Sequence, residues 1–198
     1  MASYCVLISA AGRCRRMGAF KPLLPIGDTP AIIHMLNNFF SCGITHAVVV
    51  TGYQEEALKE ACSIYSSITF VHNPGYLTNE MYDSIQLGLA AVPEECSHIL
   101  FTPVDIPFVS PESIQTVMNT DGKLVFPSYH YKKGHPLKIS KEFFSALLSY
   151  NGEDGLRGAL RSLPVSPVYA EVEDPFILTD MDTPEAYQML LKQYQEVR

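Results

Sequence analysis

Short apolar segments rich in β-branched residues recur along the chain, and most are separated by stretches long enough for a helix. The segments are Tyr4–Ile8, Ala47–Thr51, Ile68–His72, His98–Thr102, Lys123–Phe126 and Val168–Val172. This alternation is typical of repeated strand–helix–strand units, whose strands lie parallel in one sheet. The pattern therefore predicts an α/β fold with a mostly parallel central sheet.

Hydroxyl–proline pairs mark the expected helix starts. Such pairs place a capping side chain before a proline suited to the first turn, and they occur at Thr29-Pro30, Ser110-Pro111 and Thr183-Pro184. Apolar residues recur at helical spacing after the first pair, and Gly43 is expected to end that helix. The segment 128–138 (SYHYKKGHPLK) breaks the α/β rhythm and is expected to form a functional loop or hairpin.

The overall composition is that of an ordinary globular protein, but the charges are unevenly distributed along the chain. The 198 residues are 47% hydrophobic and 18% charged, which fits one globular domain spanning residues 1–198. The net charge of −7 argues against a general nucleic-acid binder, because such proteins neutralise phosphates with Lys and Arg. Residues 1–27 contain four cations and no acid, whereas residues 28–198 carry 10 cations against 21 acids, a net of −11.

The expected environment is the cytoplasm. The five cysteines form no C-x-x-C pair and no zinc-ligand spacing, so reduced thiols fit best. No apolar run approaches the roughly 18 to 20 residues that span a bilayer, and no membrane partner is expected.

The cationic segment surrounds two glycines directly after the first predicted strand. Glycines let backbone N–H groups converge on phosphate oxygens, and the cations Arg13, Arg15, Arg16 and Lys21 can neutralise what the amides do not. Five residues separate Gly12 from Gly18, so the pattern is neither a Walker A loop nor G-x-G-x-x-G. The alternative is a structural turn with a solvated basic face.

Carboxylates follow the fourth strand and precede the last helix. Asp105 stands where strand His98–Thr102 ends, and a hard oxygen ligand there suits Mg²⁺ beside a bound triphosphate. Asp180 and Asp182 are further candidates for the metal shell. The alternatives are simple capping roles, for Asp105 in a turn and for Asp182 at the helix beginning at Pro184.

Two polar side chains elsewhere are candidates for ligand contact. Ser84, in the helical segment 79–89, could meet the base or ribose of a nucleotide, with hydroxyl capping as the equal alternative. His135, held extended by the proline that follows it, could contact an acceptor or be a surface histidine.

Together these segments resemble the MobA-like nucleotidyltransferase family, and within it the molybdenum-cofactor cytidylyltransferases that join CTP to molybdopterin. The resemblance spans almost the whole chain. The family carries Leu-Ala-Ala-Gly-x-Ser-x-Arg-Met-Gly-x-x-Lys, against SAAGRCRRMGAFK at residues 9–21. Its other motifs fall, in family order, on Asp105-Ile106-Pro107, Gly134-His135-Pro136, Asp154-Gly155-Leu156-Arg157 and the segment from Asp180 to Pro184.

The resemblance implies a Rossmann-like, three-layer nucleotidyltransferase fold and an Mg²⁺-dependent transfer of a nucleoside monophosphate from an NTP to a phosphorylated acceptor. It favours CTP, because Ala11 follows the cytidine pattern of the family, and molybdopterin as the acceptor. The roles implied are catalysis for Arg16 and Lys21; nucleotide binding for Ala10, Ala11, Gly12, Arg13, Cys14, Gly18 and Ser84; metal binding for Asp105, Asp180 and Asp182; and acceptor binding for His135, Asp154 and Arg157.

Two other functions stay open: transfer to a sugar phosphate or an alditol phosphate, and nucleotide binding without catalysis. The chain also departs from the family pattern. Ser9 replaces a leucine, Cys14 a Ser or Thr, and Glu80 a glycine, while Asp83 and Gln86 stand where the family tends to have Ser and Arg. These departures spare Arg16, Lys21 and Asp105, and they cluster where the nucleotide and the acceptor are expected.

Overall fold

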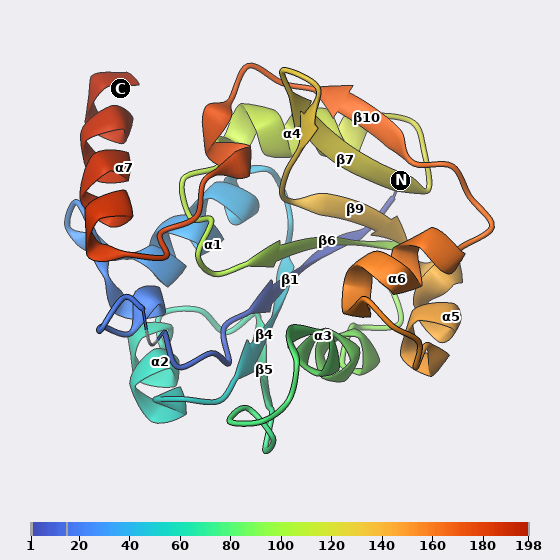
Figure 1. Ribbon diagram of the computed structural model, residues 1–198, viewed down its shortest axis with the longest axis horizontal. Helices are drawn as coiled ribbons and strands as arrows, with labels where there is room; N and C mark the ends of the chain where they lie inside the picture. The colour runs from blue at the N-terminus through green and yellow to red at the C-terminus, as the bar shows by residue number, and fades with distance from the viewer. Residues whose placement is uncertain (1, 15, 198) are drawn as a thin grey trace.

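The computed structural model describes residues 2–14 and 16–197. Within them one eight-stranded sheet takes strands from both ends of the chain (Figure 1). Its strands are β1 Tyr4–Ser9, β4 His46–Thr51, β5 Ile68–His72, β6 His98–Pro103, β7 Leu124–Tyr129, β8 Lys132–Lys133, β9 Leu137–Ser140 and β10 Val168–Glu171. The order is β10-β7-β9-β6-β1-β4-β5, with β8 paired to β7. The six predicted strands are confirmed, with small shifts at their ends.

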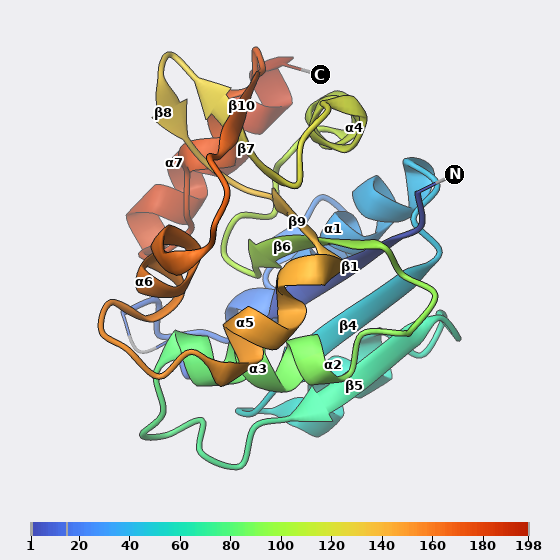
Figure 2. The same cartoon turned by 90° about the vertical axis from the view of Figure 1, so that its right-hand side faces the viewer.

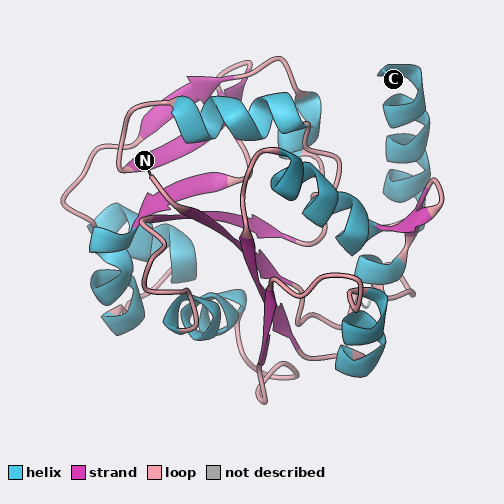
Figure 3. Ribbon diagram, turned by 180° about the vertical axis from the view of Figure 1, so that it is seen from behind, coloured by secondary structure: helices cyan, strands magenta, loops and turns pink. Residues whose placement is uncertain are grey.

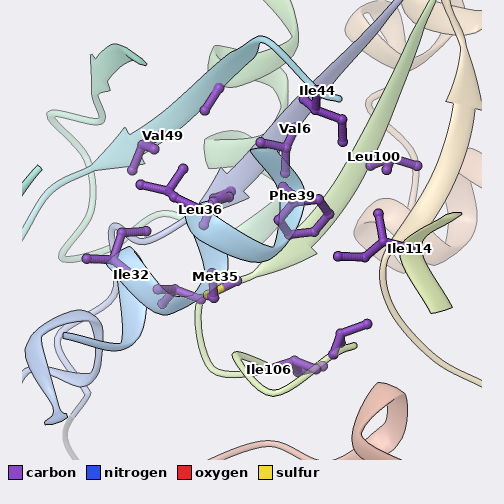
Figure 4. Close-up of a cluster of buried hydrophobic side chains, with 14 of the residues drawn as sticks. Val6, Ile32, Met35, Leu36, Phe39, Ile44, Val49, Leu100, Ile106 and Ile114 are labelled. Carbon is purple, nitrogen blue, oxygen red and sulfur yellow. The ribbon is translucent and has the colours of Figure 1, made fainter. Parts of the chain in front are cut away.

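Helices cover both faces of the sheet, as Figures 1 and 2 show. One face carries α1 Ala31–Ser41, α2 Glu55–Ala61 and α4 Pro111–Asn119, and the other α3 Met81–Ala90, α5 Phe144–Ser149 and α6 Gly155–Ser162. The alternation of side chains along β1 explains both layers. Val6 packs against Leu36 and Phe39 of α1 in one core (Figure 4), while Cys5 and Leu7 belong to the core on the α3 face.

The last helix, α7 Pro184–Val197, stands at the edge of the molecule beside a two-stranded hairpin of β2 Pro25–Ile26 and β3 Thr29–Pro30 (Figure 3). Ile26, Tyr187 and Leu190 share a small third core there with Met17 of the loop after β1. The C-terminal helix therefore supports that loop from outside. Within the described ranges, no helix combines the length and apolar character needed to cross a bilayer.

Two of the three predicted helix caps are confirmed. Ser110 Oγ accepts the N–H of Ser113 at 3.2 Å, and Thr183 Oγ1 accepts that of Ala186 at 3.2 Å. The prediction for Thr29 is wrong. Thr29 lies in β3 and makes no cap, because the hairpin extends the chain up to Pro30 before α1 begins. The first helix does end just before Gly43, whose φ is 84°.

The segment 128–138 forms the predicted hairpin from β7 and β8, but its continuation is a strand that the pattern did not predict. β9 lies antiparallel between β6 and β7, inside the sheet. Lys138 in this strand is only 3% exposed, and its Nζ donates to Met118 O at 3.2 Å, near the end of α4. The search for apolar runs missed this strand because a lysine, whose apolar stem is buried, interrupts its apolar residues.

A buried carboxylate fixes the path of the chain before α7. Asp174, 5% exposed, accepts hydrogen bonds from Ser110 N, Ser113 Oγ and Phe176 N, each at 2.9 Å. These bonds hold the 3₁₀ turn η3 Pro175–Leu178 against the start of α4. The segment that follows carries Asp180 and Asp182 back towards β6, and Met181 N donates to Asp105 O at 2.9 Å.

Candidate active site

A cavity of about 330 Å³ opens at the carboxyl ends of β1 and β6, between the loop after β1 and the start of α3. Its lining combines amide, hydroxyl, cationic and carboxylate groups. The lining residues are Ser9, Ala11, Gly12, Cys14, Arg16, Lys21, Asn73, Tyr76, Asn79, Glu80, Met81, Ser84, Pro103, Val104, Asp105 and Asp182. This is the edge of the sheet at which an open α/β fold binds ligands.

The loop after β1 is shaped by two residues with left-handed backbone, Cys14 (φ 52°) and Gly18 (φ 69°). Cys14 O accepts the N–H groups of Met17 at 3.1 Å and Gly18 at 3.2 Å, which closes a turn, and Met17 is buried against the α7 core. A Cβ added to Gly12 would meet no atom within 4 Å, so the backbone there faces open space. Gly12 and Cys14 both line the cavity. Arg15 lies outside the described residues.

Four charged side chains converge beside this loop. Lys21, 6% exposed at the start of the 3₁₀ turn η1 Lys21–Leu23, places Nζ 3.2 Å from Asp105 Oδ2 and also contacts Asp182 Oδ1. Arg16 reaches the other oxygen of Asp182 at 2.6 Å. Three segments that lie far apart in the sequence, around residues 16–21, 105 and 182, thus meet at this position.

The side chains of Arg16, Lys21, Asp105 and Asp182 form a charge cluster, in which contacts shift the pKa values of Lys21 and Asp182. Burial acts to lower the pKa of Lys21, but its contacts with Asp182 and Asp105 outweigh burial, and the pKa is raised. The hydrogen bond from Lys21, together with the charges of Lys21 and Arg16, lowers the pKa of Asp182. Both shifts favour the charged forms of the Lys21–Asp182 pair.

The predicted metal ligands are only partly brought together. Asp105 and Asp182 share Lys21, whereas Asp180 is exposed and does not line the cavity. Partial burial, and then the charges of Asp182 and Asp105, raise the pKa of Asp180. Over residues 2–14 and 16–197, no three His, Cys, Asp or Glu side chains are arranged so that they could hold a metal ion. Asp105, Asp180 and Asp182 therefore form no such set by themselves.

Ser84 lines the other end of the cavity and is held there by Asn73. Asn73 Nδ2 donates to Ser84 Oγ at 2.9 Å, and Asn73 Oδ1 accepts the N–H of Gly75 at 2.9 Å. Asn73 is 1% exposed and directly follows β5. The sequence reasoning missed Asn73, Tyr76 and Asn79. The rule that placed Asp105 after its strand would have found Asn73 after β5.

Three residues predicted to bind the nucleotide lie beside the cavity rather than in its lining. Ala10 is buried, with its N–H donated to Val50 O at 2.9 Å, and Gly18 closes the turn described above. The Arg13 guanidinium lies 5.9 Å from the centre of the Tyr53 ring. Cys14 does line the cavity; burial raises the pKa of its thiol, which is therefore protonated at neutral pH.

None of the three predicted acceptor residues lines the cavity. His135 lies beside β6, with Nδ1 3.4 Å from Phe101 O, and burial lowers its pKa, so its ring is neutral at pH 7. Asp154 precedes α6 and forms an ion pair with Arg161, and Arg157 is exposed on the same helix. Because α6 packs against α3, both residues lie on the α3 side of the cavity.

Comparisons with known proteins agree with this geometry. A family model described as the MobA-like NTP transferase domain matches residues 6–168. The chain is 28% identical over 193 residues to the molybdenum cofactor cytidylyltransferase of Escherichia coli (strain K12), covering 96% of this chain and 97% of that protein.

Solved structures show the same fold. Rv0371c from Mycobacterium tuberculosis H37Rv has a TM-score of 0.82 and 23% identity, covering 96% of this chain and 98% of that one. A nucleotidyl transferase from Methanothermobacter thermautotroptrophicus has a TM-score of 0.83 and 21% identity, covering 99% of each chain. The predicted α/β nucleotidyltransferase fold, with a mostly parallel central sheet, is confirmed.

Proposed function

Because the chain belongs to the MobA-like NTP transferase domain family of nucleotidyltransferases, we propose that it is an Mg²⁺-dependent cytidylyltransferase. In this proposal it transfers CMP from CTP to a phosphorylated small molecule, with molybdopterin as the favoured acceptor, and releases pyrophosphate. The observation that carries the proposal is the charge cluster beside the glycine loop, at the carboxyl edge of the sheet. The relative named as a molybdenum cofactor cytidylyltransferase, matched over nearly its whole length, supports this choice of substrates.

The reaction needs no protein nucleophile. An oxygen of the acceptor phosphate attacks the α-phosphorus of CTP, the bond from that phosphorus to the bridging oxygen breaks, and pyrophosphate leaves with the electron pair. The amides of residues 11–14 bind the phosphates, while Arg16 and Lys21 stabilise the charge that develops on the leaving group. Positioning and charge stabilisation account for most catalysis in phosphoryl-type transfers.

The residues present fit a magnesium ion whose coordination shell is completed by oxygens of the substrate. Mg²⁺ is usually held by one or two carboxylates together with phosphate oxygens and water, and seldom by protein ligands alone. Asp105 and Asp182 would supply the two carboxylates. When bound, Mg²⁺ would neutralise phosphate charge and polarise the α-phosphate. Lys21 then exchanges its carboxylate partners for phosphate oxygens. Asp180 is a further ligand in this proposal, after rotation of its exposed side chain.

In this proposal the nucleotide fills the cavity, and the acceptor binds beside it. Ala11, Gly12 and Cys14 contact the triphosphate, and Ser84, oriented by Asn73, contacts the ribose or the base. Ala10, Arg13 and Gly18 act by shaping the loop. His135, Asp154 and Arg157 bind the acceptor beside the cavity. The same acceptor position could equally take a sugar phosphate or an alditol phosphate.

The experiment that tests the proposal is a pyrophosphate-release assay with four nucleoside triphosphates. Each is combined with molybdopterin, a sugar phosphate, an alditol phosphate or no acceptor. We expect release with CTP and molybdopterin that depends on Mg²⁺. Release with another acceptor would transfer the proposal to that substrate class. Nucleotide binding without release from any acceptor would favour the non-catalytic alternative.

We also propose that residues 1–198 form one domain and that the protein acts in the cytoplasm. One sheet takes its strands from Tyr4 to Glu171, which supports a single domain. All five cysteines are free thiols in the described structure, a state typical of proteins in reducing compartments.

A further inference from the structure

Asn73 is a buried amide whose orientation is set by the hydrogen bonds around it. The residue is 1% exposed, and its backbone N–H donates to Thr51 O at 2.8 Å. Its Oδ1 accepts the N–H of Gly75 at 2.9 Å and Asn79 Nδ2 at 3.4 Å. A backbone N–H can only donate, so this bond identifies the oxygen of the amide. The amide nitrogen therefore faces α3, where it donates to Ser84 Oγ at 2.9 Å.

Ser84 is left with a proton that no protein atom accepts. The residue is 5% exposed and lines the cavity from the first half of α3. Its oxygen already accepts a hydrogen bond from Asn73, so its single proton has to be donated elsewhere. Over residues 2–14 and 16–197, no atom accepts a hydrogen bond from Ser84 Oγ. The hydroxyl therefore offers its proton to the molecule that fills the cavity.

This arrangement restricts the ligand atom that can lie against the hydroxyl. A hydrogen-bond acceptor of the ligand takes the proton, whereas a donor leaves two buried protons facing each other, each without a partner. A ribose hydroxyl can rotate to donate or to accept, so it is tolerated in either case. A ring nitrogen of a base has one polarity only. N3 of cytosine is an acceptor, and N3 of uracil carries a hydrogen and is a donor.

We propose that Asn73 is a positioning residue that holds the Ser84 hydroxyl as a donor to N3 of a cytosine base, and that this bond selects CTP over UTP. The inference rests on the proposed function and deepens it, because it states which part of the nucleotide Ser84 contacts and with which polarity. The charge cluster and the loop after β1 take the triphosphate, so the base extends to the end of the cavity that Ser84 lines.

The variant Asn73→Asp reverses the polarity of Ser84 while hardly changing the size of its neighbour. A carboxylate in this position can accept the N–H of Gly75, Asn79 Nδ2 and the hydroxyl proton of Ser84. Three donors stabilise its ionised form in the buried site. Ser84 then gives its proton to residue 73 and presents only lone pairs to the cavity, which suits a ligand donor such as N3–H of uracil.

The measurement is isothermal titration calorimetry with CTP and with UTP, in the presence of Mg²⁺ and without an acceptor. The ratio of the two dissociation constants is compared among variants, because an added negative charge weakens both triphosphates together. We expect the wild-type protein to bind CTP about tenfold more tightly than UTP, the scale for one hydrogen bond lost at a buried donor. In Asn73→Asp we expect the preference to reverse, so that UTP binds more tightly.

The matched control is Asn79→Asp, which makes the same chemical change in the lining of the same cavity. Asn79 does not contact Ser84, and its exposed side chain can turn to solvent, so this variant should keep the preference for CTP. Ser84→Ala removes the hydroxyl and should abolish the preference. Adding Asn73→Asp to Ser84→Ala should then change the ratio no further, because the two residues act through one bond.

Several results would overturn the proposal. Equal binding of CTP and UTP by the wild-type protein would place Ser84 against the ribose, and binding of neither would remove the nucleotide from this cavity. A preference for CTP that persists in Asn73→Asp would show that Ser84 polarity does not select the base. If circular dichroism shows that Asn73→Asp is unfolded, Ser84→Ala decides, and an unchanged preference for CTP in that variant refutes the role of the hydroxyl.

Pyrophosphate release separates this inference from the proposed function. Release from CTP and an acceptor, together with an unchanged nucleotide preference in Asn73→Asp, would refute the role of Asn73 and keep the cytidylyltransferase. A preference that reverses in the binding measurement, without release from any acceptor by the wild-type protein, would support Asn73 and refute the proposed reaction.

Discussion

Replacing Lys21 by methionine tests the charge cluster through both stability and catalysis. The ammonium is 6% exposed and faces two carboxylates whose side chains are each 24% exposed. Each pair is worth on the order of 4 kcal/mol of Coulomb energy at 4 Å and an effective dielectric near 20. The cost of desolvating the charges cancels much of this gain. We therefore expect Lys21→Met to lower the free energy of unfolding by about 2 kcal/mol, between the values for surface and buried ion pairs.

For a chain of this size, about 2 kcal/mol corresponds to a fall of roughly 4 to 8 °C in Tm at pH 7. The assay is thermal unfolding followed by circular dichroism in metal-free buffer. The matched control is Lys59→Met, which removes a partly exposed lysine that pairs with Glu55 on α2. The control should melt close to the wild-type temperature.

The pH dependence of this effect has a defined sign. The pKa of Asp182 is lowered in the folded protein, so its contribution is present above about pH 4 and is lost as pH falls through the folded pKa. The pKa of Lys21 is raised, so its contribution is present below about pH 10 and is lost as pH rises through the folded pKa. The Tm difference between wild type and Lys21→Met should therefore be largest between these limits.

The same variant should lower turnover by roughly 10²- to 10³-fold, the scale for removing one preorganised stabilising group. An unchanged Tm across pH 4 to 9 would show that the cluster does not form in the free protein. Turnover near the wild-type value would refute the role of Lys21 in the reaction, whatever the stability result.

Three further variants test the site and its support. Asp105→Asn should abolish Mg²⁺-dependent pyrophosphate release while circular dichroism shows a folded protein; retained release would place the metal elsewhere. Asp174→Ala should cost about 3 kcal/mol in urea unfolding, because three hydrogen bonds to a buried carboxylate are lost; a loss below about 1 kcal/mol would contradict this. Gly88→Val should cost about 1 to 3 kcal/mol, since even a Cβ would lie 2.4 Å from Leu7 Cδ1 and 2.7 Å from Val50 Cγ2; wild-type stability would disprove the tight contact.

The sequence predicted those features whose cause is local. Apolar, β-branched runs located six strands, and the position of Asp105 directly after one of them placed it at the cavity. The glycines and cations after β1 predicted a charged loop at this edge of the sheet. In each case the deciding interactions lie within a few residues of one another.

Features with a tertiary cause could not be predicted in this way. β9 escaped because Lys138 is buried against the end of α4, a contact that no local pattern encodes. Thr29 has the sequence form of a cap, yet its pairing in a hairpin overrides that preference. The hydrogen bond from Asn73 to Ser84 joins the end of β5 to α3, so it too depends on tertiary packing.

Transfer of CMP is tested most directly by following the α-phosphorus of CTP. The wild-type protein is incubated with α-labelled CTP, Mg²⁺ and molybdopterin, and the products are separated. We expect label to enter the acceptor in an amount equal to the pyrophosphate released, and Lys21→Met to lower both amounts together. Label recovered only as CTP or as free CMP would contradict transfer to the acceptor.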